Sequence, residues 1–512
     1  MVTPWLTVLW LLPVVGASVV LLTPRAMARP AKIVALAASL ATLAVAVVLV
    51  VGFEPGAPGF QYVESHSWIE SFGARYELGV DGIALVLILL TTVLLPVLLL
   101  AGWNDHRFGR PGTPPHVYVA AMLLVESMVL MSFCALDVLL FYVFFESMLI
   151  PMYFLIGGFG GPGRAAAAVK FLLYNLLGGL VMLAAVVGLY VVTMQSDAFE
   201  SGTFGFRDIA AAASAGELGV SPGALHALFL GFMFAFAIKA PLWPFHSWLP
   251  DAAVESTPAT AVLMMAVVDK VGTFAMLRYC LQLFPESSRY FAPVVITLAV
   301  IGIVYGAVLA IASTDVMRLI AYTSISHFGF IVLGIFVMTG QGQAGSALYM
   351  VNHGLSTAAL FLVAGFLVSR RGTRVISHFG GVQKAAPVMA GTFLVAGLAT
   401  LSLPGLAPFV SEFLVLVGTY SRYGVAAVVA STALVLSAIY ILWLYQRVMT
   451  GPKRAENDGM KDLVPRELAV MVPLIALLVF LGVYPKPLLD VITPAVKTTV
   501  TVVDFTEAGG ER

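Results

Sequence analysis

The sequence predicts an all-α polytopic membrane protein with about fourteen transmembrane helices. Hydrophobic residues make up 60% of the 512 residues, and only 11% are charged. Apolar runs of eighteen or more residues recur along the whole chain. Each run is long enough to cross a hydrocarbon core of about 30 Å as a helix. The short segments of alternating polarity that a membrane β-barrel requires are missing, which leaves helices as the spanning elements.

Charged residues and Gly/Pro breaks divide the chain into fourteen candidate spans. They begin near residues 3, 30, 80, 116, 138, 168, 225, 256, 291, 318, 344, 386, 423 and 467. The first, "MVTPWLTVLWLLPVVGASVVLL", lacks a charged leading region and is long enough to span, so we expect a retained helix rather than a cleaved signal. Most of the 27 Lys and Arg residues lie in or beside the odd-numbered connections. This bias predicts that those connections are cytoplasmic and that both termini lie outside.

Two spans are too long for one straight crossing and are interrupted by prolines. Residues 225–254 contain "APLWP", and residues 386–418 contain "LPGLAP". Spans four to eight and nine to thirteen could be two copies of one five-helix unit, because the broken span would then be the fourth of each copy. A unit with an odd number of helices ends on the opposite side of the membrane, so the second copy would be inverted. Paired broken helices in inverted repeats mark a transport site near the midplane. The predicted units are an N-terminal three-helix segment (1–115), two repeats (116–284 and 285–450), and a last helix with a tail (451–512).

Composition also excludes several function classes. The 27 basic and 27 acidic side chains balance, so nucleic acid finds no basic surface. The two cysteines, Cys134 and Cys280, cannot form a disulfide framework or hold an iron–sulfur cluster. The stretch "GFGGPG" at 158–163 matches a dinucleotide-binding pattern, but it follows an apolar helix and contains a proline, so it is a loop. We therefore expect no redox cofactor and no metal in this chain.

Two ionisable residues stand deep inside apolar segments. Glu146 follows eight aliphatic or aromatic residues, and Lys239 lies within the first broken span. A charge at the bilayer centre costs about 3 kcal/mol, so both side chains should face the bundle interior and compensate each other as an ion pair. Moving the carboxylate away would change the proton affinity of the lysine. The prolines beside Lys239 should free carbonyl groups that solvate its ammonium and admit water.

Further titratable residues continue the series. Lys270 lies in "MMAVVDKVGTFAMLR", His327 in "YTSISHFGF", His353 in "MVNHGLSTAALF" and Glu412 just beyond the second break. A row of Lys, His and carboxylate groups joined by polar side chains and water can relay protons through a membrane. The alternative is structural: the charged residues form fixed ion pairs between helices, and the histidines form packing hydrogen bonds.

Glu126, in "MLLVESMVL", is either a second carboxylate for Lys239 or a structural partner. Asp269, next to Lys270, is expected to point away from the cavity of that lysine. Other polar residues are predicted to be end caps (Asp137, Asp315), loop residues (Asp251, Glu255) or an interfacial or turn contact (His246).

Four stretches closely resemble one family: "ALDVLLFYVFFESMLIPMYFLIG", "FAFAIKAPLWPFHSWLPDA", "TDVMRLIAYTSISHFGF" and "SLPGLAPFVSEFL". They are similar to the antiporter-like membrane subunit M, or chain 4, of NADH:quinone oxidoreductase (respiratory complex I), from about residue 80 to about residue 450. The resemblance implies fourteen helices with inverted five-helix repeats and a subunit that translocates protons. It also implies that FMN and iron–sulfur clusters lie elsewhere in the complex.

The resemblance assigns roles residue by residue. Glu146 matches the ion-pair carboxylate, Lys239 its partner, Lys270 the central lysine and Glu412 the terminal carboxylate. His327 and His353 match histidines of the central axis, and Glu126 matches the glutamate of the fourth span. The chain departs from the pattern at Ala253, where a histidine is common, at Asp269, where an apolar residue is usual, and at Met317, where a basic residue is usual.

The leading hypothesis is a proton-translocating, non-redox subunit in a bacterial plasma membrane. A proton enters from the cytoplasm to Lys239, passes to Lys270, moves along His327 and His353, and leaves through Glu412. The implied partners are other membrane-arm subunits, including two sister antiporter-like subunits, together with lipids, protons and water. One alternative is a subunit of an Mrp-type cation/proton antiporter, although a lysine is usual there at the position of Glu412. A second alternative is a scaffold of the membrane arm.

Overall fold

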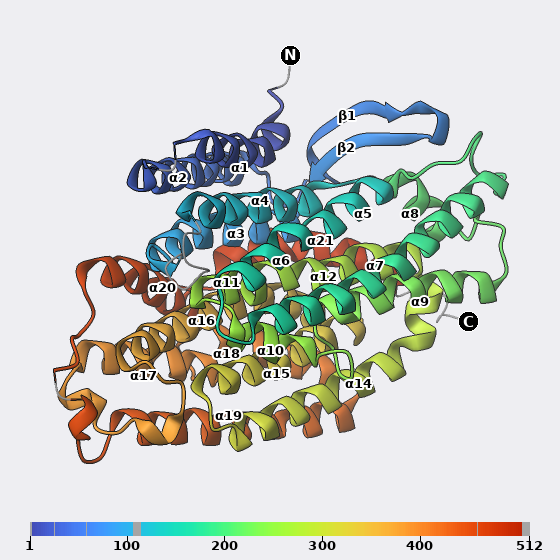
Figure 1. The fold of residues 1–512 in the computed structure, drawn as a ribbon. Helices are drawn as coiled ribbons and strands as arrows, with labels where there is room; N and C mark the ends of the chain where they lie inside the picture. The colour runs from blue at the N-terminus through green and yellow to red at the C-terminus, as the bar shows by residue number, and fades with distance from the viewer. Residues whose placement is uncertain (1–2, 25, 58, 106–113, 458, 504–512) are drawn as a thin grey trace.

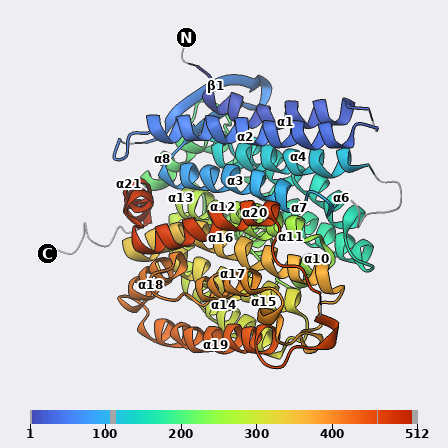
Figure 2. The same ribbon diagram turned by 90° about the vertical axis from the view of Figure 1, so that its left-hand side faces the viewer.

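The computed structural model shows a bundle of long helices lying side by side (Figure 1). It describes residues 3–24, 26–57, 59–105, 114–457 and 459–503, so the predicted C-terminal unit is described as far as residue 503. The chain starts with α1 (Trp5–Leu22) and α2 (Ala28–Gly52) at one edge of the bundle. It reaches α19 (Gly424–Met449) at the opposite edge, as Figures 1 and 2 both show.

Thirteen spans in the described part of the chain are long and apolar enough to cross a membrane. Besides α1, α2 and α19, they are α3 (Gly82–Ala101), α4 (Pro115–Cys134), α5 with α6 (Val138–Ser147, Leu149–Phe159), α7 (Arg164–Gln195), α9 (Pro222–Lys239), the composite span Pro258–Leu283, α14 (Pro285–Ala312), α15 (Val316–Phe336), α16 (Gly340–Arg371) and α20 (Pro465–Val483). The remaining predicted span is divided into α17 (Pro387–Thr400) and α18 (Ala407–Tyr420), each too short to cross alone. The prediction of about fourteen spans is confirmed.

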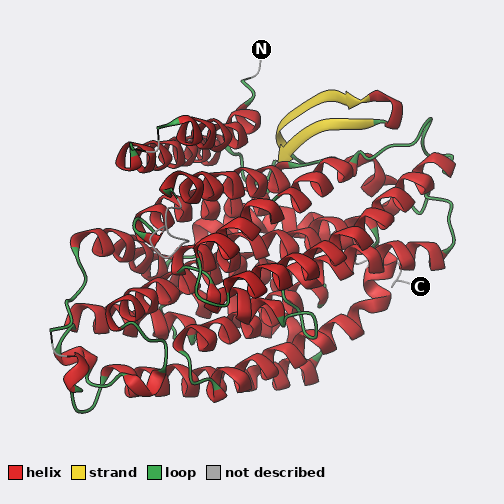
Figure 3. Ribbon diagram, viewed as in Figure 1, coloured by secondary structure: helices red, strands yellow, loops and turns green. Residues whose placement is uncertain are grey.

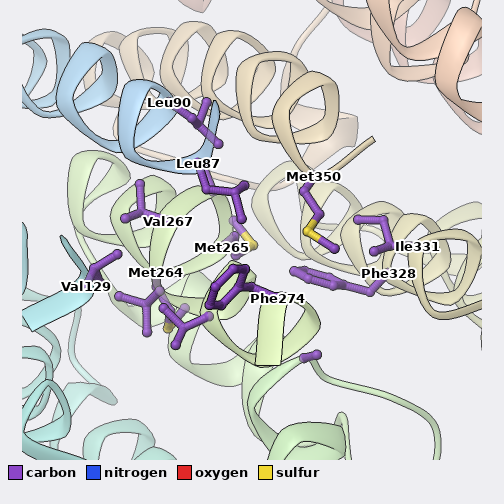
Figure 4. Packing of buried hydrophobic residues seen from close by; sticks show 14 of the residues in the cluster. Leu87, Leu90, Val129, Met264, Met265, Val267, Phe274, Phe328, Ile331 and Met350 are labelled. Atoms are coloured by element: carbon purple, nitrogen blue, oxygen red, sulfur yellow. The ribbon is translucent and has the colours of Figure 1, made fainter. Parts of the chain in front are cut away.

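Three spans that carry part of the predicted titratable series, the composite span, α15 and α16, are hidden inside the bundle, whereas the apolar windows of α9 and of α5 with α6 are 50% buried. The apolar window of Pro258–Leu283 is 100% buried and those of α15 and α16 are 94% buried, against 33% for α1 and 28% for α2. Figure 4 shows this interior, where Met265 and Phe274 of the composite span lie close to Phe328 of α15 and Met350 of α16. The polar residues of the central spans therefore sit within apolar packing rather than against lipid.

The composite span is not a regular α-helix. It consists of α11 (Pro258–Val262), the π-helix η3 (Leu263–Val268), α12 (Asp269–Ala275), the π-helix η4 (Met276–Cys280) and α13 (Leu281–Leu283). π-helical turns shift the hydrogen-bond pattern from i−4 to i−5 and are frequent at functional sites. This irregularity was not predicted from the sequence, because no proline or glycine stands at either π-helical segment.

A β-hairpin at one end of the bundle was also not predicted. Strands β1 (Gln61–Ile69) and β2 (Ala74–Val80) pair antiparallel, with Ser65 opposite Glu77, and they are the strands drawn in Figure 3. The Leu136 amide donates a 2.9 Å hydrogen bond to the Glu77 carbonyl. The Glu77 side chain pairs with Arg207 of α8 (Phe206–Ala215), which fixes the hairpin to two other connections at this end.

The C-terminal helix α21 (Lys486–Val503) packs against α3 and α16. It buries Ile492, Val496 and Thr499 and is seen nearly end-on in Figure 2. Gln282 Nε2 donates a 3.2 Å hydrogen bond to Thr499 Oγ1. The sequence left its position open, and the structure places it against the chain's own helices.

Candidate functional site

The first helix break places Lys239 at the end of α9. The chain leaves the helix through Pro241 and Pro244 and resumes as α10 (Trp248–Glu255). Proline cannot donate a backbone hydrogen bond, so carbonyls near the break lose their helical partners. Trp248 Nε1 satisfies one of them with a 3.0 Å hydrogen bond to the Ile238 carbonyl. The predicted interruption of this span is confirmed.

Lys239 is 1% exposed and lies next to the segment that carries Glu146. Its Nζ donates a 3.5 Å hydrogen bond to the Phe145 carbonyl and lies 4.4 Å from the centre of the Phe145 ring. Glu146 is partly exposed and, among the described residues, forms no ion pair within 4.0 Å. The expectation of a direct Glu146–Lys239 pair is therefore wrong for this structure. The carbonyl that binds the ammonium belongs to α5 rather than to the broken helix, which corrects a second expectation.

Glu146 is confined by a neighbouring helix. A Cβ added to Gly179 of α7 would lie 1.9 Å from the nearest Glu146 carboxylate oxygen. Only a residue without a side chain allows α7 to lie over this carboxylate. The position of Glu146 therefore depends on a glycine one helix away.

Lys270 lies at the start of α12, between the two π-helical segments, and is fully buried. Its Nζ donates a 3.1 Å hydrogen bond to the Met265 carbonyl, five residues earlier, and lies 2.6 Å from His353 Nδ1. The Phe328 ring centre is 4.1 Å from the same nitrogen. The irregular helix thus supplies a carbonyl to the ammonium, while α16 supplies the next titratable group.

From His353 the polar groups continue to Glu412. The His353 and His327 ring centres are 5.4 Å apart. His327 Nδ1 lies 2.5 Å from the Tyr349 hydroxyl, which donates a 3.0 Å hydrogen bond to Glu412 Oε2. All four side chains are buried. The structure therefore joins four predicted residues, Lys270, His353, His327 and Glu412, through Tyr349, with His353 rather than His327 next to the lysine.

The second helix break holds Glu412 in place. Ser402, in the turn between α17 and α18, has a φ of 61° and donates a hydrogen bond to Glu412 Oε2. A positive φ is strained for a serine, and such residues cluster at functional sites. Asn352 Nδ2 donates a 2.7 Å hydrogen bond to the Ala407 carbonyl at the start of α18. The break thus binds both the terminal carboxylate and α16.

Two buried acids have no hydrogen-bond partner among the described residues. Glu126 of α4 and Asp269 of α12 are both fully buried, and both oxygens of each carboxyl are unpaired among the described residues. No ion pair joins Glu126 to Lys239, so its predicted role as a second carboxylate for that lysine stays a prediction.

The predictions for the remaining polar residues are confirmed in some cases and wrong in others. Asp137 and Asp315 are end caps as expected: the carboxylate of Asp137 accepts from the Leu140 amide, and that of Asp315 from the Met317 and Arg318 amides. His246 lies in the turn between α9 and α10, one of its two expected places, and its ring is 5.1 Å from that of Tyr305 of α14. Asp251 and Glu255 do not lie in a loop. They belong to α10, where Asp251 pairs with Lys170 at 2.8 Å and Arg318 at 3.0 Å.

A cavity of about 740 Å³ opens at the end of the bundle that holds Arg164 and Arg374. Asp105 and Thr257 line it, and Tyr118 donates a 3.5 Å hydrogen bond to Asp105 while lying 3.0 Å from the Thr257 hydroxyl. Burial raises the pKa of Asp105 to about 6, against the opposing effects of the Thr257 hydroxyl and the Arg466 charge. Among the described residues, no cluster of three His, Cys, Asp or Glu side chains suited to a metal ion exists.

Tyr349 and Ser402 were not selected from the sequence. Tyr349 precedes His353 by four residues, so the two share one face of α16, and this spacing would have indicated it. Ser402 directly precedes "LPGLAP", but its bond to Glu412 depends on a tertiary turn that spacing does not reveal.

Comparison with known proteins agrees with this geometry. The family model described as "NADH:quinone oxidoreductase/Mrp antiporter, TM" matches residues 135–437. NADH-quinone oxidoreductase subunit M of Mycobacterium tuberculosis (strain ATCC 25618 / H37Rv) is 65% identical over 525 residues, covering 98% of this chain and 94% of the relative. A chain of respiratory complex I from Thermus thermophilus with bound NADH is 31% identical with a TM-score of 0.86, covering 97% of this chain and 99% of that one. A chain of the Mrp complex from Dietzia shares the fold, with a TM-score of 0.82 at 21% identity over 98% of this chain and 100% of that one. The chain, whose matched region holds both broken helices and the whole polar series from Glu146 to Glu412, belongs to the family of NADH:quinone oxidoreductase and Mrp antiporter membrane subunits.

Proposed function

We propose that this chain is the proton-translocating, non-redox M-type subunit of the membrane arm of an NADH:quinone oxidoreductase. One observation carries the proposal: Lys270, His353, His327, Tyr349 and Glu412 form a buried row of titratable and hydroxyl groups across α12, α15, α16 and α18. Intramembrane ionisable groups that line up in this way mark proton pathways. The 65% identity to a subunit M supports this assignment over an Mrp-type antiporter.

The two lysines and two carboxylates have distinct proposed roles. Glu146 controls the charge state of Lys239 by approaching or leaving it. Lys239 passes a proton to Lys270, and the histidines and Tyr349 conduct it to Glu412, from which it is released. Moving one charge against 100 mV requires about 2.3 kcal/mol, so the energy comes from partner subunits.

The partners and placement follow from this role. Other membrane-arm subunits, including two sister antiporter-like subunits, flank the chain, and FMN and iron–sulfur clusters belong to other subunits. The complex lies in a bacterial plasma membrane with both termini outside. The breaks at 240–247 and 401–406 support two inverted repeats, over 116–284 and 285–450.

Replacing Lys239 or Lys270 by alanine tests the function. In membranes with an assembled complex, each variant should abolish most of the NADH-driven proton gradient, measured by quenching of a pH-sensitive dye. Lys486→Ala, at an exposed side chain of α21, serves as the control. Unchanged pumping by both variants would favour the scaffold. Copurification of the chain without flavin and iron–sulfur proteins would favour the antiporter.

A further inference from the structure

Asp269, like Glu126, is a fully buried acid that the relay above leaves unused. Its side chain is 0% exposed, and neither carboxylate oxygen has a hydrogen-bond partner among the described residues. A buried polar group without a partner is costly, and a buried carboxyl needs compensation by a proton, a cation or water. Such an exception in a packed interior calls for a functional explanation.

The helix turns Asp269 toward α9. Residues three apart on a helix share a face, and Gly272 follows Asp269 by three. A Cβ added to Gly272 would lie 3.1 Å from the Lys239 Cβ and 3.0 Å from the Ala240 amide nitrogen. This face of α12 therefore lies directly against the end of α9 that carries Lys239. The charges of Asp269 and Lys239 act on each other across this contact.

Lys270, the next residue, faces a different helix. Its ammonium lies 2.6 Å from His353 of α16 and 4.1 Å from the centre of the Phe328 ring of α15. Consecutive residues on an α-helix are about 100° apart around its axis. One turn of α12 therefore presents an acid to the α9 side and an amine to the α16 side. This agrees with the expectation that Asp269 points away from the cavity of Lys270, and it places the acid against the helix end that carries Lys239.

We propose that Asp269 is a proton-carrying residue between Lys239 and Lys270. This inference rests on the proposed function. In the first step the Lys239 ammonium gives a proton to the Asp269 carboxylate, which leaves a neutral amine and a carboxylic acid. In the second step the acid gives that proton to the neutral amine of Lys270, and the carboxylate is regenerated. No ion pair within 4.0 Å joins Asp269 to either lysine, so each step requires a side-chain rotation or a bridging water.

Asp269→Asn in the assembled complex tests the proposal, because the amide keeps the shape and cannot carry the proton. NADH-driven proton pumping should fall by about tenfold or more, the range in which removal of a proton-transfer group acts. Asp269→Glu should restore most of it. Thr273→Val is the matched control on the same helix, since among the described residues the Thr273 hydroxyl bonds only to the Lys270 carbonyl, at 3.1 Å, and it should pump normally.

Normal pumping by Asp269→Asn, with Lys270→Ala inactive, would overturn this inference and leave the proposed function intact. Normal pumping by Lys270→Ala as well would overturn the proposed function itself. If Asp269→Asn does not assemble, the pair Asp269→Glu and Asp269→Gln decides the matter, because these side chains have the same length and only one carries a proton. Equal pumping by the pair, or failure of both to assemble, counts against a proton-carrying role and for a structural one.

Discussion

The Tyr349 hydroxyl donates a 3.0 Å hydrogen bond to Glu412, and the same oxygen lies 2.5 Å from His327 Nδ1. A phenol both donates and accepts, so one oxygen can take a proton from the imidazole side and give one to the carboxylate side. Among the described residues, Tyr349 is therefore the hydrogen-bonded link between His327 and Glu412. The path depends on a residue whose own charge does not have to change.

Tyr349→Phe should interrupt this path while preserving the packing of the ring. We expect proton pumping to fall by about tenfold or more, with normal assembly, because a single oxygen is removed. The matched control is Tyr279→Phe, which removes another buried hydroxyl, bonded to the Ala135 carbonyl at 3.2 Å. Equal pumping rates in the two variants would show that the hydroxyl link is dispensable.

Gly179→Ala should impair coupling through Glu146. The new methyl group would overlap the Glu146 carboxylate, which must move away from its position beside α7. Pumping should decrease although no titratable group is removed. In contrast, a Cβ at Gly391 of α17 meets no atom within 4 Å, so Gly391→Ala should pump normally and stabilise its helix by up to about 1 kcal/mol. Proton pumping and NADH oxidation in membrane vesicles, compared for the two variants, measure the difference.

Asp105 should make the chain less stable as the pH rises. Its carboxyl has an ordinary pKa of 3.8, and burial raises it to about 6 in the folded protein. Between these values the folded state binds more protons than the unfolded state, so stability falls with rising pH and is constant above about pH 6. The cost is on the order of 2 to 3 kcal/mol at neutral pH. Asp105→Asn should therefore raise the thermal midpoint of the purified complex at pH 7.5 but not at pH 4.

The exposed Asp197→Asn serves as the control for the loss of one negative charge. A rise in midpoint of the same size in both variants at pH 7.5 would attribute the effect to net charge. A rise for Asp105→Asn that is as large at pH 4 would contradict the linkage to its titration.

The sequence predicted the fold well because each span must satisfy its backbone within a helix, so length and hydropathy reveal it. Pro241 and Pro404 indicated the helix breaks, because proline cannot donate the backbone hydrogen bond that a continuous helix requires. The ladder of β1 and β2 was missed because a hairpin in the connection between two spans leaves no mark on the hydropathy by which the spans are found. The inference of a direct Glu146–Lys239 pair was wrong. The position of a residue along its span predicts how deep it lies in the membrane, but it does not fix the distance between side chains on two different helices. The helix that Asp269 faces is defined only by tertiary packing, whereas the four-residue spacing of Tyr349 from His353 was available in the sequence.

The pair Arg370–Glu467 should contribute more stability than the pair Lys486–Asp490. Arg370 Nη2 and Nη1 bind the Glu467 carboxylate at 2.5 and 3.2 Å and join α16 to α20. The two side chains are 14% and 7% exposed, whereas those of Lys486 and Asp490 are 65% and 53% exposed. Removing Arg370 leaves the Glu467 carboxylate with only the more distant Arg466, at 3.9 Å, to compensate its charge, so Arg370→Ala should destabilise the chain by about 2 kcal/mol or more. Lys486→Ala should cost less than about 1 kcal/mol, because water already solvates that pair.

The double variant Arg370→Ala with Glu467→Gln separates the two causes. If the lone carboxylate is the main penalty, neutralising Glu467 recovers part of the lost stability, and the thermal midpoint of the complex lies above that of Arg370→Ala alone. A midpoint equal to that of the single variant would instead assign the loss to the hydrogen bonds from Arg370 to the Lys461 and Asp462 carbonyls, at 2.7 and 3.0 Å, which both variants lack. In that case Arg370 stabilises the chain mainly through its hydrogen bonds to the connection before α20, and its ion pair with Glu467 contributes less.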